Sequence, residues 1–432
     1  MCGRFKTFTR LGAALLFTTA VCGGQHATAE EVTITYSDWQ LAQEGWGKSL
    51  RTAIEEFEAQ NPGIKVVTEP VQLAQRDVRF TTAIRAGQGP DVFALDANPV
   101  RQYISEGWVL GLSRFAEARD SSFFDDFYET SLAPVTVDGI VYGIPMNTVA
   151  MGLVYNQSKF EAAGLSQPAT SWEEFSTHAE ALTDAGAGQW ATTLVLAPAG
   201  FDLRVPSIFH SFGASFLTSD WSASALDTPE MKAAFTYVVD LIKSGAVPPG
   251  VTQVDANGAR RLLANGQIAM AIGTTWTIPE VSTMNPDLDG WNVLRIAPLP
   301  TDGGRQISPH TTLYQKSLFI NANTKHPDAA WALVNFLTER AQMERWFDDN
   351  NMLSSRRSVN ESYGPIQESP FASVVSQEIQ HGTFLPLIPE WPRILDTFRQ
   401  NLQDAVTGTK TAEQALADAH RETNAILKAS RN

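Results

Sequence analysis

Thiols are nearly absent from this sequence. Its 432 residues include two cysteines, Cys2 and Cys22, and both lie within the first 29 residues, which we predict to be removed. The remaining chain would then have no disulfide and no thiolate metal ligand, so its hydrophobic core alone must stabilise the fold. The roughly 400 remaining residues exceed a comfortable single core, which favours two domains.

Positive charge is also scarce, since 32 Lys and Arg residues stand against 47 Asp and Glu, for a formal net charge of −15. This balance argues against nucleic acid or an anionic membrane surface as a partner.

Long apolar runs are missing too. No stretch approaches the roughly 20 uncharged apolar residues that cross a bilayer, so we expect a soluble mature protein.

The first 29 residues have the composition of an export signal. A basic start precedes the apolar run from Leu11 to Ala20, and Ala27-Thr28-Ala29 forms an A-x-A cleavage site. The alternative is a lipid anchor on Cys22, which the bulky Val21 before it disfavours. We predict cleavage after Ala29 and release into a Gram-negative periplasm, because an unanchored exported protein needs an outer membrane to retain it.

Signatures of cofactor binding and catalysis are missing as well. The stretch from Ala42 to Ser49 ends like a phosphate-binding loop, but Ala42 replaces the first required glycine and Glu44 would repel phosphate. We expect a loop and a helix start near a cleft there instead. The histidines show no metal-binding spacing, and no G-x-S-x-G motif is present. We therefore predict no catalytic residue, no metal and no cofactor.

Strand and helix patterns alternate along the chain. Val32 to Trp39 alternates like a strand, Leu50, Ile54 and Phe57 recur at helical spacing, and Ile64 to Thr68 forms the next strand. Strands separated by helices indicate an α/β fold with a mostly parallel sheet. No linker or repeat divides the sequence, which favours two lobes that share strands over two independent domains.

Five segments, in one order, carry the most specific signal. Together they resemble the carbohydrate-type extracellular solute-binding proteins of ABC importers, the maltose-binding-protein-like group. The resemblance extends from about residue 32 to the C-terminus. The segments are GQGPDVFALDA at 87–97, YISEGWVLGLS at 103–113, VDGIVYGIPMNTVAMGLVYN at 137–156, NGQIAMAIGTTW at 265–276 and NANTKHPDAAWALVNFL at 321–337.

The resemblance implies a two-lobed periplasmic-binding-protein fold with a ligand cleft between the lobes. Residues 30–148 and 300–339 would form the N-terminal lobe, and residues 149–299 and 340–432 the C-terminal lobe. The chain would cross between them about three times, near 146–150, 297–303 and 337–342. It implies a monomer that captures a small sugar, from a monosaccharide to a trisaccharide or a polyol, and delivers it to an ABC permease. It implies no enzymatic activity.

Aromatic residues in loops are the first candidates for the ligand site. A sugar presents patches of C–H groups, which flat indole rings cover. Trp276 follows the turn residues after an apolar strand, Trp391 lies between prolines that suggest an irregular backbone, and Trp39 ends the first strand. Each position matches or neighbours a segment that, in the family, contacts ligand. We therefore place these three indoles in the cleft.

Polar candidates would pair with sugar hydroxyl groups. The resemblance implies a ligand contact for Asp96, which ends the third strand, and for Asp38 in the first loop, while Asn147 lies at the first expected crossing. A turn or cap role is the alternative for all three. His310 stands where the family often has Gly-Gly, so it would reshape the pocket floor. Arg356 lies where the family often has a proline motif, and would contact hydroxyls or an anionic group, unless it is simply solvated.

Three alternatives remain open from the sequence. The same fold could bind a sugar phosphate, a sulfosugar or another polar solute. A different class, an exported polysaccharide-processing enzyme, would also use aromatic subsites and carboxylates. A sensory adaptor for a chemoreceptor would share the same ligand cleft.

Overall fold

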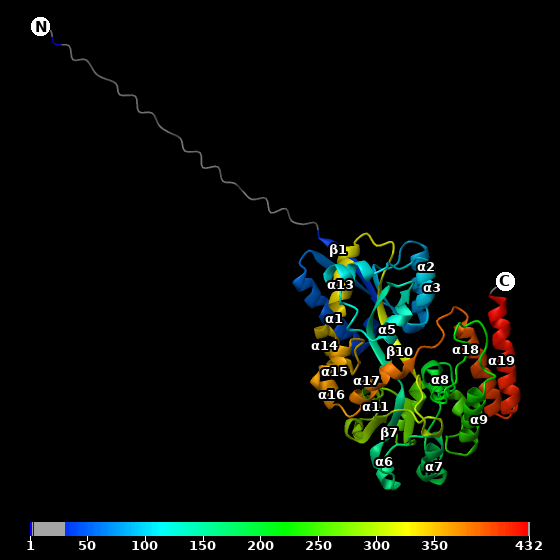
Figure 1. Ribbon diagram of the computed structural model, residues 1–432. Coiled ribbons are helices and arrows are strands. Elements are labelled where there is room, and N and C mark those ends of the chain that lie inside the picture. Colours follow the sequence, from blue (N-terminus) through cyan, green and yellow to red (C-terminus); the bar gives the residue numbers. More distant parts are fainter. Residues whose placement is uncertain (2, 4–30, 431–432) are drawn as a thin grey trace.

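The computed structural model describes residues 1, 3 and 31–430, so the predicted cleavage site and nearly all of the predicted leader lie outside the described residues. Two α/β lobes lie end to end, each built around its own sheet (Figure 1). The predicted fold class is confirmed. No helix among residues 31–430 combines the length and the apolar character that crossing a bilayer requires.

The first lobe is built on a six-stranded sheet. Strands β1 and β3 run parallel, as the predicted βαβ units require, whereas β10 enters from late in the chain and pairs antiparallel with β3 and β6. The sheet comprises β1 (Val32–Asp38), β2 (Ile64–Pro70), β3 (Val92–Asp96), β6 (Gly143–Ala150), β10 (Thr311–Ile320) and β11 (Gly382–Thr383).

Helices cover this first sheet because each presents one apolar face to it. In α1, for example, Leu50, Ile54 and Phe57 are buried, as their spacing predicts. The α-helices of this part of the chain are α1 (Glu44–Gln60), α2 (Arg76–Arg85), α3 (Val100–Ser105), α4 (Ser113–Arg119), α5 (Glu129–Leu132), α13 (Pro327–Leu337), α14 (Arg340–Asn350), α15 (Arg357–Ser362), α16 (Gly364–Glu368) and α17 (Ala372–Glu378). Strands β4 (Thr136–Val137) and β5 (Ile140–Val141) form a short antiparallel hairpin.

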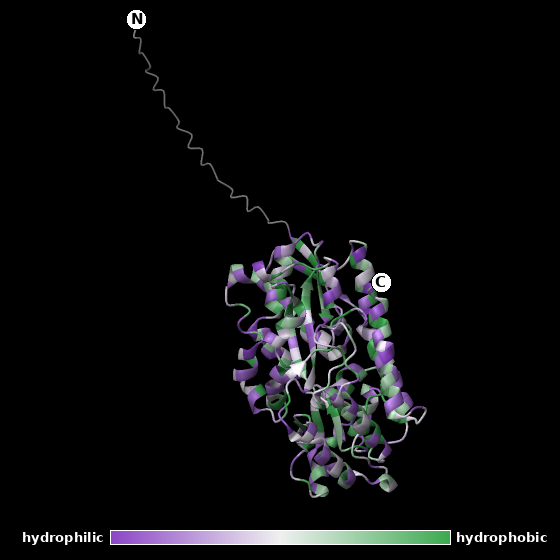
Figure 2. Ribbon diagram, turned by 45° about the vertical axis from the view of Figure 1, so that its right-hand side comes forward, coloured by the Kyte–Doolittle hydropathy of each residue, from purple (hydrophilic) through white to green (hydrophobic). Residues whose placement is uncertain are grey.

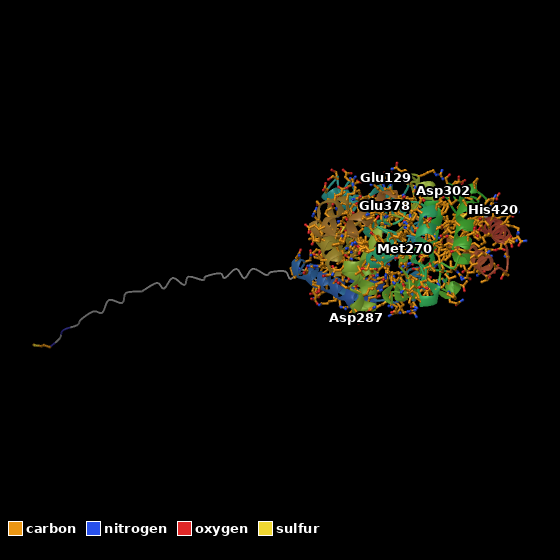
Figure 3. The ribbon with its side chains drawn as sticks, turned by 90° about the horizontal axis from the view of Figure 1, so that it is seen from below. Glu129, Met270, Asp287, Asp302, Glu378 and His420 are labelled. Carbon is orange, nitrogen blue, oxygen red and sulfur yellow. The ribbon has the colours of Figure 1, made fainter. Side chains whose placement is uncertain are left out.

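The second lobe has a three-stranded antiparallel sheet with β7 in the centre. Neighbouring residues face opposite sides, so Leu153 and Met270 join one apolar core while Val154 and Ala271 join the other. Met270 is fully buried, and in the view from below it falls near the middle of the outline (Figure 3). The strands are β7 (Gly152–Asn156), β8 (Met270–Gly273) and β9 (Leu294–Ala297).

Helices lie on both faces of the second sheet, and Figure 2 shows apolar strands inside the lobes with polar residues on the outer faces of the helices. Because both faces are covered, the strands are almost entirely buried. The helices are α6 (Gln157–Ala162), α7 (Trp172–Leu182), α8 (Phe201–Ser211), α9 (Pro229–Lys243), α10 (Ala256–Ala264), α11 (Thr277–Met284), α12 (Gly290–Val293), α18 (Trp391–Val406) and α19 (Ala412–Ala429).

Two of the three expected crossings lie close to their predicted positions. The chain leaves the first sheet at Met151, between β6 and β7, and returns between β9 and β10. The third does not lie at 337–342, because α14 packs against α1 of the first lobe, where Arg345 makes two hydrogen bonds of 2.8 Å to Glu56. The chain passes later, between β11, which pairs with β10 of the first sheet, and α18, which packs in the core of the second lobe. The other predicted lobe boundaries stay predictions.

Trp391 belongs to the core of the second lobe, so its predicted place in the cleft is wrong. Its side chain is 1% exposed, and its ring meets the edge of Phe216 at 5.5 Å. The physical reason lies in Pro392, which occupies the first turn of α18. Proline is well tolerated there, so the proline pattern marks a regular helix start and not an irregular loop.

We predict that Trp391→Ala lowers the unfolding free energy of the ligand-free protein by about 3–5 kcal/mol, because it leaves a cavity in a packed aromatic cluster. Urea denaturation of the mature protein measures this. Trp291→Ala is the matched control, since Trp291 is 46% exposed, and it should cost less than about 1 kcal/mol. If both variants lower the unfolding free energy by the same small amount, Trp391 does not have a core role.

Candidate ligand-binding cavity

A cavity of about 450 Å³ lies between the two lobes. The first lobe contributes the loop after β1, the start of α1 and the end of β3, and the second contributes the starts of α8, α10 and α11. Residues 313–315 of β10 also line it. The strand ends of an open α/β sheet are where such folds bind ligands, so the cavity has the expected position.

Trp39 lines this cavity with most of its ring buried between two cations. The guanidinium of Arg76 lies 4.5 Å from its ring centroid, and the ammonium of Lys316 lies 5.3 Å away. Cation–π attraction to both groups holds the indole in one orientation. Trp39 is 4% exposed, so only a small part of it reaches the cavity.

Asp38 is not a lining residue, although we predicted a ligand contact for it. It is fully buried behind Trp39, where its carboxylate accepts hydrogen bonds from Lys316 Nζ at 2.8 Å and from the Tyr36 hydroxyl at 2.7 Å. Burial lowers the pKa of Lys316, while Asp38 opposes this by raising it. Asp38 therefore neutralises a buried cation and positions Trp39 next to it.

Asp96 ends β3 and lines the cavity, as predicted. Its Oδ2 accepts a hydrogen bond of 2.8 Å from Arg76, and the same carboxylate interacts with the Tyr314 side chain, whose pKa is raised by burial and then by Asp96. Burial alone would lower the pKa of Arg76, but Asp96 and Asp77 raise it, so the guanidinium stays charged. A carboxylate has acceptor sites for more than two hydrogen bonds, so Asp96 could also accept one from a ligand hydroxyl.

Trp276 and Trp46 add two further indoles to the cavity lining. Trp276 immediately precedes α11, and its ring meets Tyr314 of β10 edge-on at 5.3 Å. Trp46 lies in the first turns of α1, which begins at Glu44. The expected loop and helix start near the cleft are therefore found at residues 42–49.

The second lobe contributes charged side chains that sequence reasoning missed. Arg204 is 5% exposed and donates one hydrogen bond, of 3.3 Å, to the carbonyl of Gly200. Burial and then the neighbouring Arg260 lower its pKa to about 10. Burial raises the pKa of Asp202, and Asp96 of the opposite lobe raises it further. Carboxylates from both lobes therefore influence each other across the cavity.

Glu280 and Arg260 form an ion pair on adjoining helices of the second lobe, and both line the cavity. Burial raises the pKa of Glu280, against the attraction of Arg260. These charged residues lie near the starts of helices, where Asp255, for example, caps α10, and this position was their only signal in the sequence.

Among the described residues, no group of three His, Cys, Asp or Glu side chains could hold a metal ion.

Asn147 and His310 do not line the cavity, which corrects our prediction. Asn147 is buried in β6, where its Oδ1 accepts a hydrogen bond of 3.1 Å from the backbone of Lys316. His310 contacts Glu378 of α17 through Nε2 at 2.5 Å and the carbonyl of Ile307 through Nδ1 at 2.8 Å. Both side chains stabilise strand and loop connections instead.

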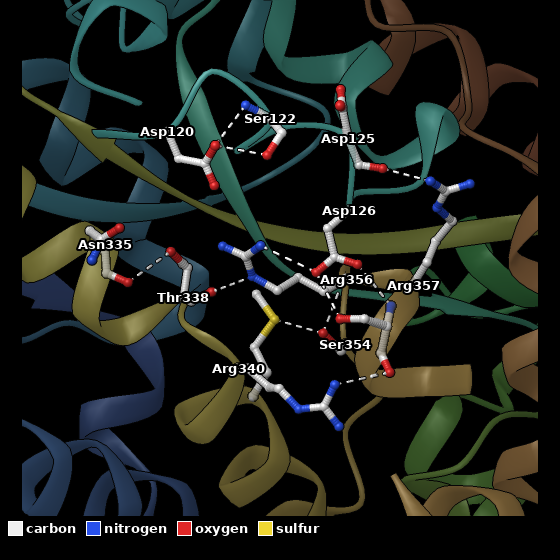
Figure 4. A network of polar contacts seen from close by, with 12 residues as sticks. Asp120, Ser122, Asp125, Asp126, Asn335, Thr338, Arg340, Ser354, Arg356 and Arg357 are labelled. Atoms are coloured by element: carbon white, nitrogen blue, oxygen red, sulfur yellow. Dashed lines mark hydrogen bonds and ion pairs between the residues drawn. The ribbon is translucent and has the colours of Figure 1, made fainter. Parts of the chain in front are cut away.

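Arg356 is also engaged away from the cavity (Figure 4). Its Nε donates to the carbonyl of Thr338 at 2.9 Å, and its Nη1 lies 3.3 Å from Asp126. The guanidinium also lies 4.4 Å from the ring centroid of Phe127. Neither of our two alternatives, a ligand contact or a solvated surface position, describes this arginine, which ties α15 to the first lobe.

Two α/β lobes that enclose a polar, aromatic cavity define a class of protein that captures small solutes between its lobes. The model of the family described as bacterial extracellular solute-binding proteins matches residues 42–344, which is more than half of the chain. The protein belongs to this family.

Several known proteins are similar over nearly the whole chain. A binding protein of Brucella abortus (strain 2308) is 24% identical over 403 residues, covering 93% of this chain and 94% of the relative. The mannitol-binding protein of Pseudomonas aeruginosa is 25% identical over 402 residues, covering 86% and 88%. A solute-binding protein from Thermotoga lettingae, solved with α-D-tagatose, is 25% identical with a TM-score of 0.79, covering 92% of this chain and all of that one.

We predict that His310 makes stability depend on pH. Burial would lower the pKa of His310, but the hydrogen bond and charge of Glu378 outweigh it and raise the pKa above its usual value. The stabilisation that the His310–Glu378 pair provides is therefore complete below about pH 6.5, the pKa of histidine in the unfolded chain. It is lost as pH rises through the higher pKa of His310 in the folded protein. His310→Gln should remove this loss, so the difference in unfolding free energy between wild type and variant shrinks as pH rises.

Urea titrations from pH 6 to 9 test this dependence. Glu378→Gln is the matched variant. It should also remove the loss of unfolding free energy that the wild type shows as pH rises. If the curves of wild type and His310→Gln run parallel over the whole range, the ion pair does not control this pH dependence.

Proposed function

We propose that this protein is the periplasmic sugar-binding subunit of an ABC importer, which captures a neutral carbohydrate and delivers it to a membrane permease. One observation carries the proposal. Trp39, Trp46 and Trp276 line a single cavity between two lobes, together with carboxylates from both lobes and guanidinium groups from the second. Indoles cover the C–H faces of a sugar ring, and the charged groups pair with its hydroxyls.

The charge arrangement favours a neutral sugar over a sugar phosphate or sulfosugar. Two cations near the cavity are paired with an acid: Arg76 contacts Asp96, and Arg260 contacts Glu280. Arg204 lies in the field of Asp202. Arg356, for which an anionic group was one of the predicted partners, is paired with Asp126. An anionic ligand would find no surplus positive charge here, whereas hydroxyls can both donate to and accept from such pairs.

The relatives support a carbohydrate ligand without specifying it. The similar proteins include the mannitol-binding protein and a maltotriose-binding protein of Pyrococcus abyssi, and the Thermotoga lettingae structure contains α-D-tagatose. These ligands are a polyol, a trisaccharide and a monosaccharide. They share a dense set of hydroxyl groups, which is the chemistry that this cavity complements.

Contacts from both lobes also suggest how a permease would recognise the loaded protein. A ligand that binds both lobes stabilises the closed arrangement more than the open one, and this differential affinity shifts the population. Closure would follow a hinge motion of two rigid lobes. We propose that a monomer in this closed form docks on the permease, and that the protein works in the periplasm after removal of residues 1–29.

The central test is a thermal-shift screen of the mature protein against neutral sugars and polyols, with sugar phosphates in parallel. A ligand at a hundredfold excess over its Kd should raise the unfolding free energy by about 2.7 kcal/mol. Stabilisation by a sugar phosphate alone would contradict a neutral ligand. Turnover of the bound glycan during prolonged incubation would instead favour the polysaccharide-processing alternative, in which carboxyls such as Asp202 and Glu280 act on the bond.

We predict that Trp276→Ala weakens binding of the sugar found in that screen by roughly 2–4 kcal/mol, because truncating an aromatic anchor costs about this much. Titration calorimetry measures the loss, and urea denaturation checks the ligand-free fold. Trp291→Ala should bind like wild type, because Trp291 does not line the cavity. A Trp276→Ala protein that binds normally would remove this indole from the site.

A further inference from the structure

Two more cavities lie beside the central one along residues 384–389, which we call the strap. Phe384 borders both the central cavity and a second cavity of about 700 Å³. Trp221 borders this second cavity and a third of about 440 Å³, which reaches Arg101 and Gln102 of α3 in the first lobe. The strap borders all three cavities, with residues 384 and 385 at the central one, 384 and 386 at the second and 387–389 at the third, so the three lie along one segment of the chain.

Trp221 occupies a backbone conformation that bulky residues rarely adopt. Its φ is +56°, in the left-handed region. The surrounding loop holds it there, since Trp221 N donates to the carbonyl of Thr218 at 2.8 Å and Thr218 N donates to the carbonyl of Ala223 at 2.9 Å. Such strain persists where the surroundings impose it, typically at functional sites. Here it places an indole between two cavities.

The second cavity differs chemically from the central one. Its lining contains no Asp, Glu, Lys or Arg, and its polar groups are hydroxyls and an amide from residues such as Ser215, Thr218, Gln306 and Ser308. Burial lowers the pKa of His210, which also lines it, to about 4, so this ring is neutral at pH 7. An uncharged lining of aromatic, hydroxyl and amide groups suits further neutral sugar units.

We propose that the ligand extends from the central cavity past Phe384 and stacks a distal sugar unit on Trp221. Resting on the proposed function, this makes the preferred ligand a neutral oligosaccharide of three or more units, and Trp221 a residue that selects for length. A monosaccharide or polyol would fill the central cavity alone and would leave Trp221 without a contact.

The test uses graded neutral oligosaccharides of one to five units, in α-1,4-glucose, β-1,4-glucose and β-1,4-mannose series, with mannitol and tagatose. Calorimetric titrations compare wild type with Trp221→Asn, because asparagine tolerates a positive φ and removes only the ring. We expect affinity to rise with length up to at least three units. Trp221→Asn should lose about tenfold affinity for the longer members, the worth of one aromatic stack, and less than threefold for the single unit.

Trp291→Ala is the control, since Trp291 borders none of the three cavities. A single unit or polyol that binds as tightly as the longer members would overturn the extended site while leaving the proposed function intact. Equal affinity losses for Trp221→Asn at every length would overturn the length selection. If no member of any series binds, the proposed function itself fails, and this inference fails with it.

Discussion

The first lobe depends on how one buried cation is paired. Lys316 lies on β10 and is completely buried, which costs several kcal/mol unless a partner offsets the loss of hydration. Asp38 supplies that partner, and Gln40 accepts a further hydrogen bond from the same ammonium. Asp38 and Gln40 flank Trp39. The contacts that offset the cost of burying Lys316 therefore also fix the loop and the indole that line the cavity.

The two walls of the cavity are built in different ways. In the first lobe, charges at strand ends satisfy each other, and Arg76 links Trp39 to Asp96 through a cation–π contact and an ion pair. In the second lobe, the starts of three helices carry the polar groups, among them Arg204 and Glu280. A ligand therefore meets the Arg76–Asp96 pair on one side and the Arg260–Glu280 pair on the other, a lining that suits hydroxyl groups better than an anion.

Much of the fold and part of the site could be predicted from the sequence, because the alternation of strands and helices is local and strand ends converge in this architecture. The family resemblance pointed to Trp39, Asp96 and Trp276, and all three line the cavity, while their contact with a ligand stays a prediction. Trp391 was misplaced because a proline in the first turn of a helix resembles a loop signal. The third crossing was misplaced because Arg345 binds Glu56, a partner 289 residues away, which no local pattern reveals. The second-lobe charges were missed because helix starts commonly carry polar residues for capping alone.

The central claim is that one neutral sugar touches both lobes inside this cavity. A crystal structure of the mature protein with its tightest neutral sugar tests this most directly. The account predicts a sugar ring against Trp39 or Trp276, with hydroxyls bonded to Asp96 on one lobe and to Arg204 or Glu280 on the other. A sugar bound to one lobe only, or outside the cavity, would contradict it.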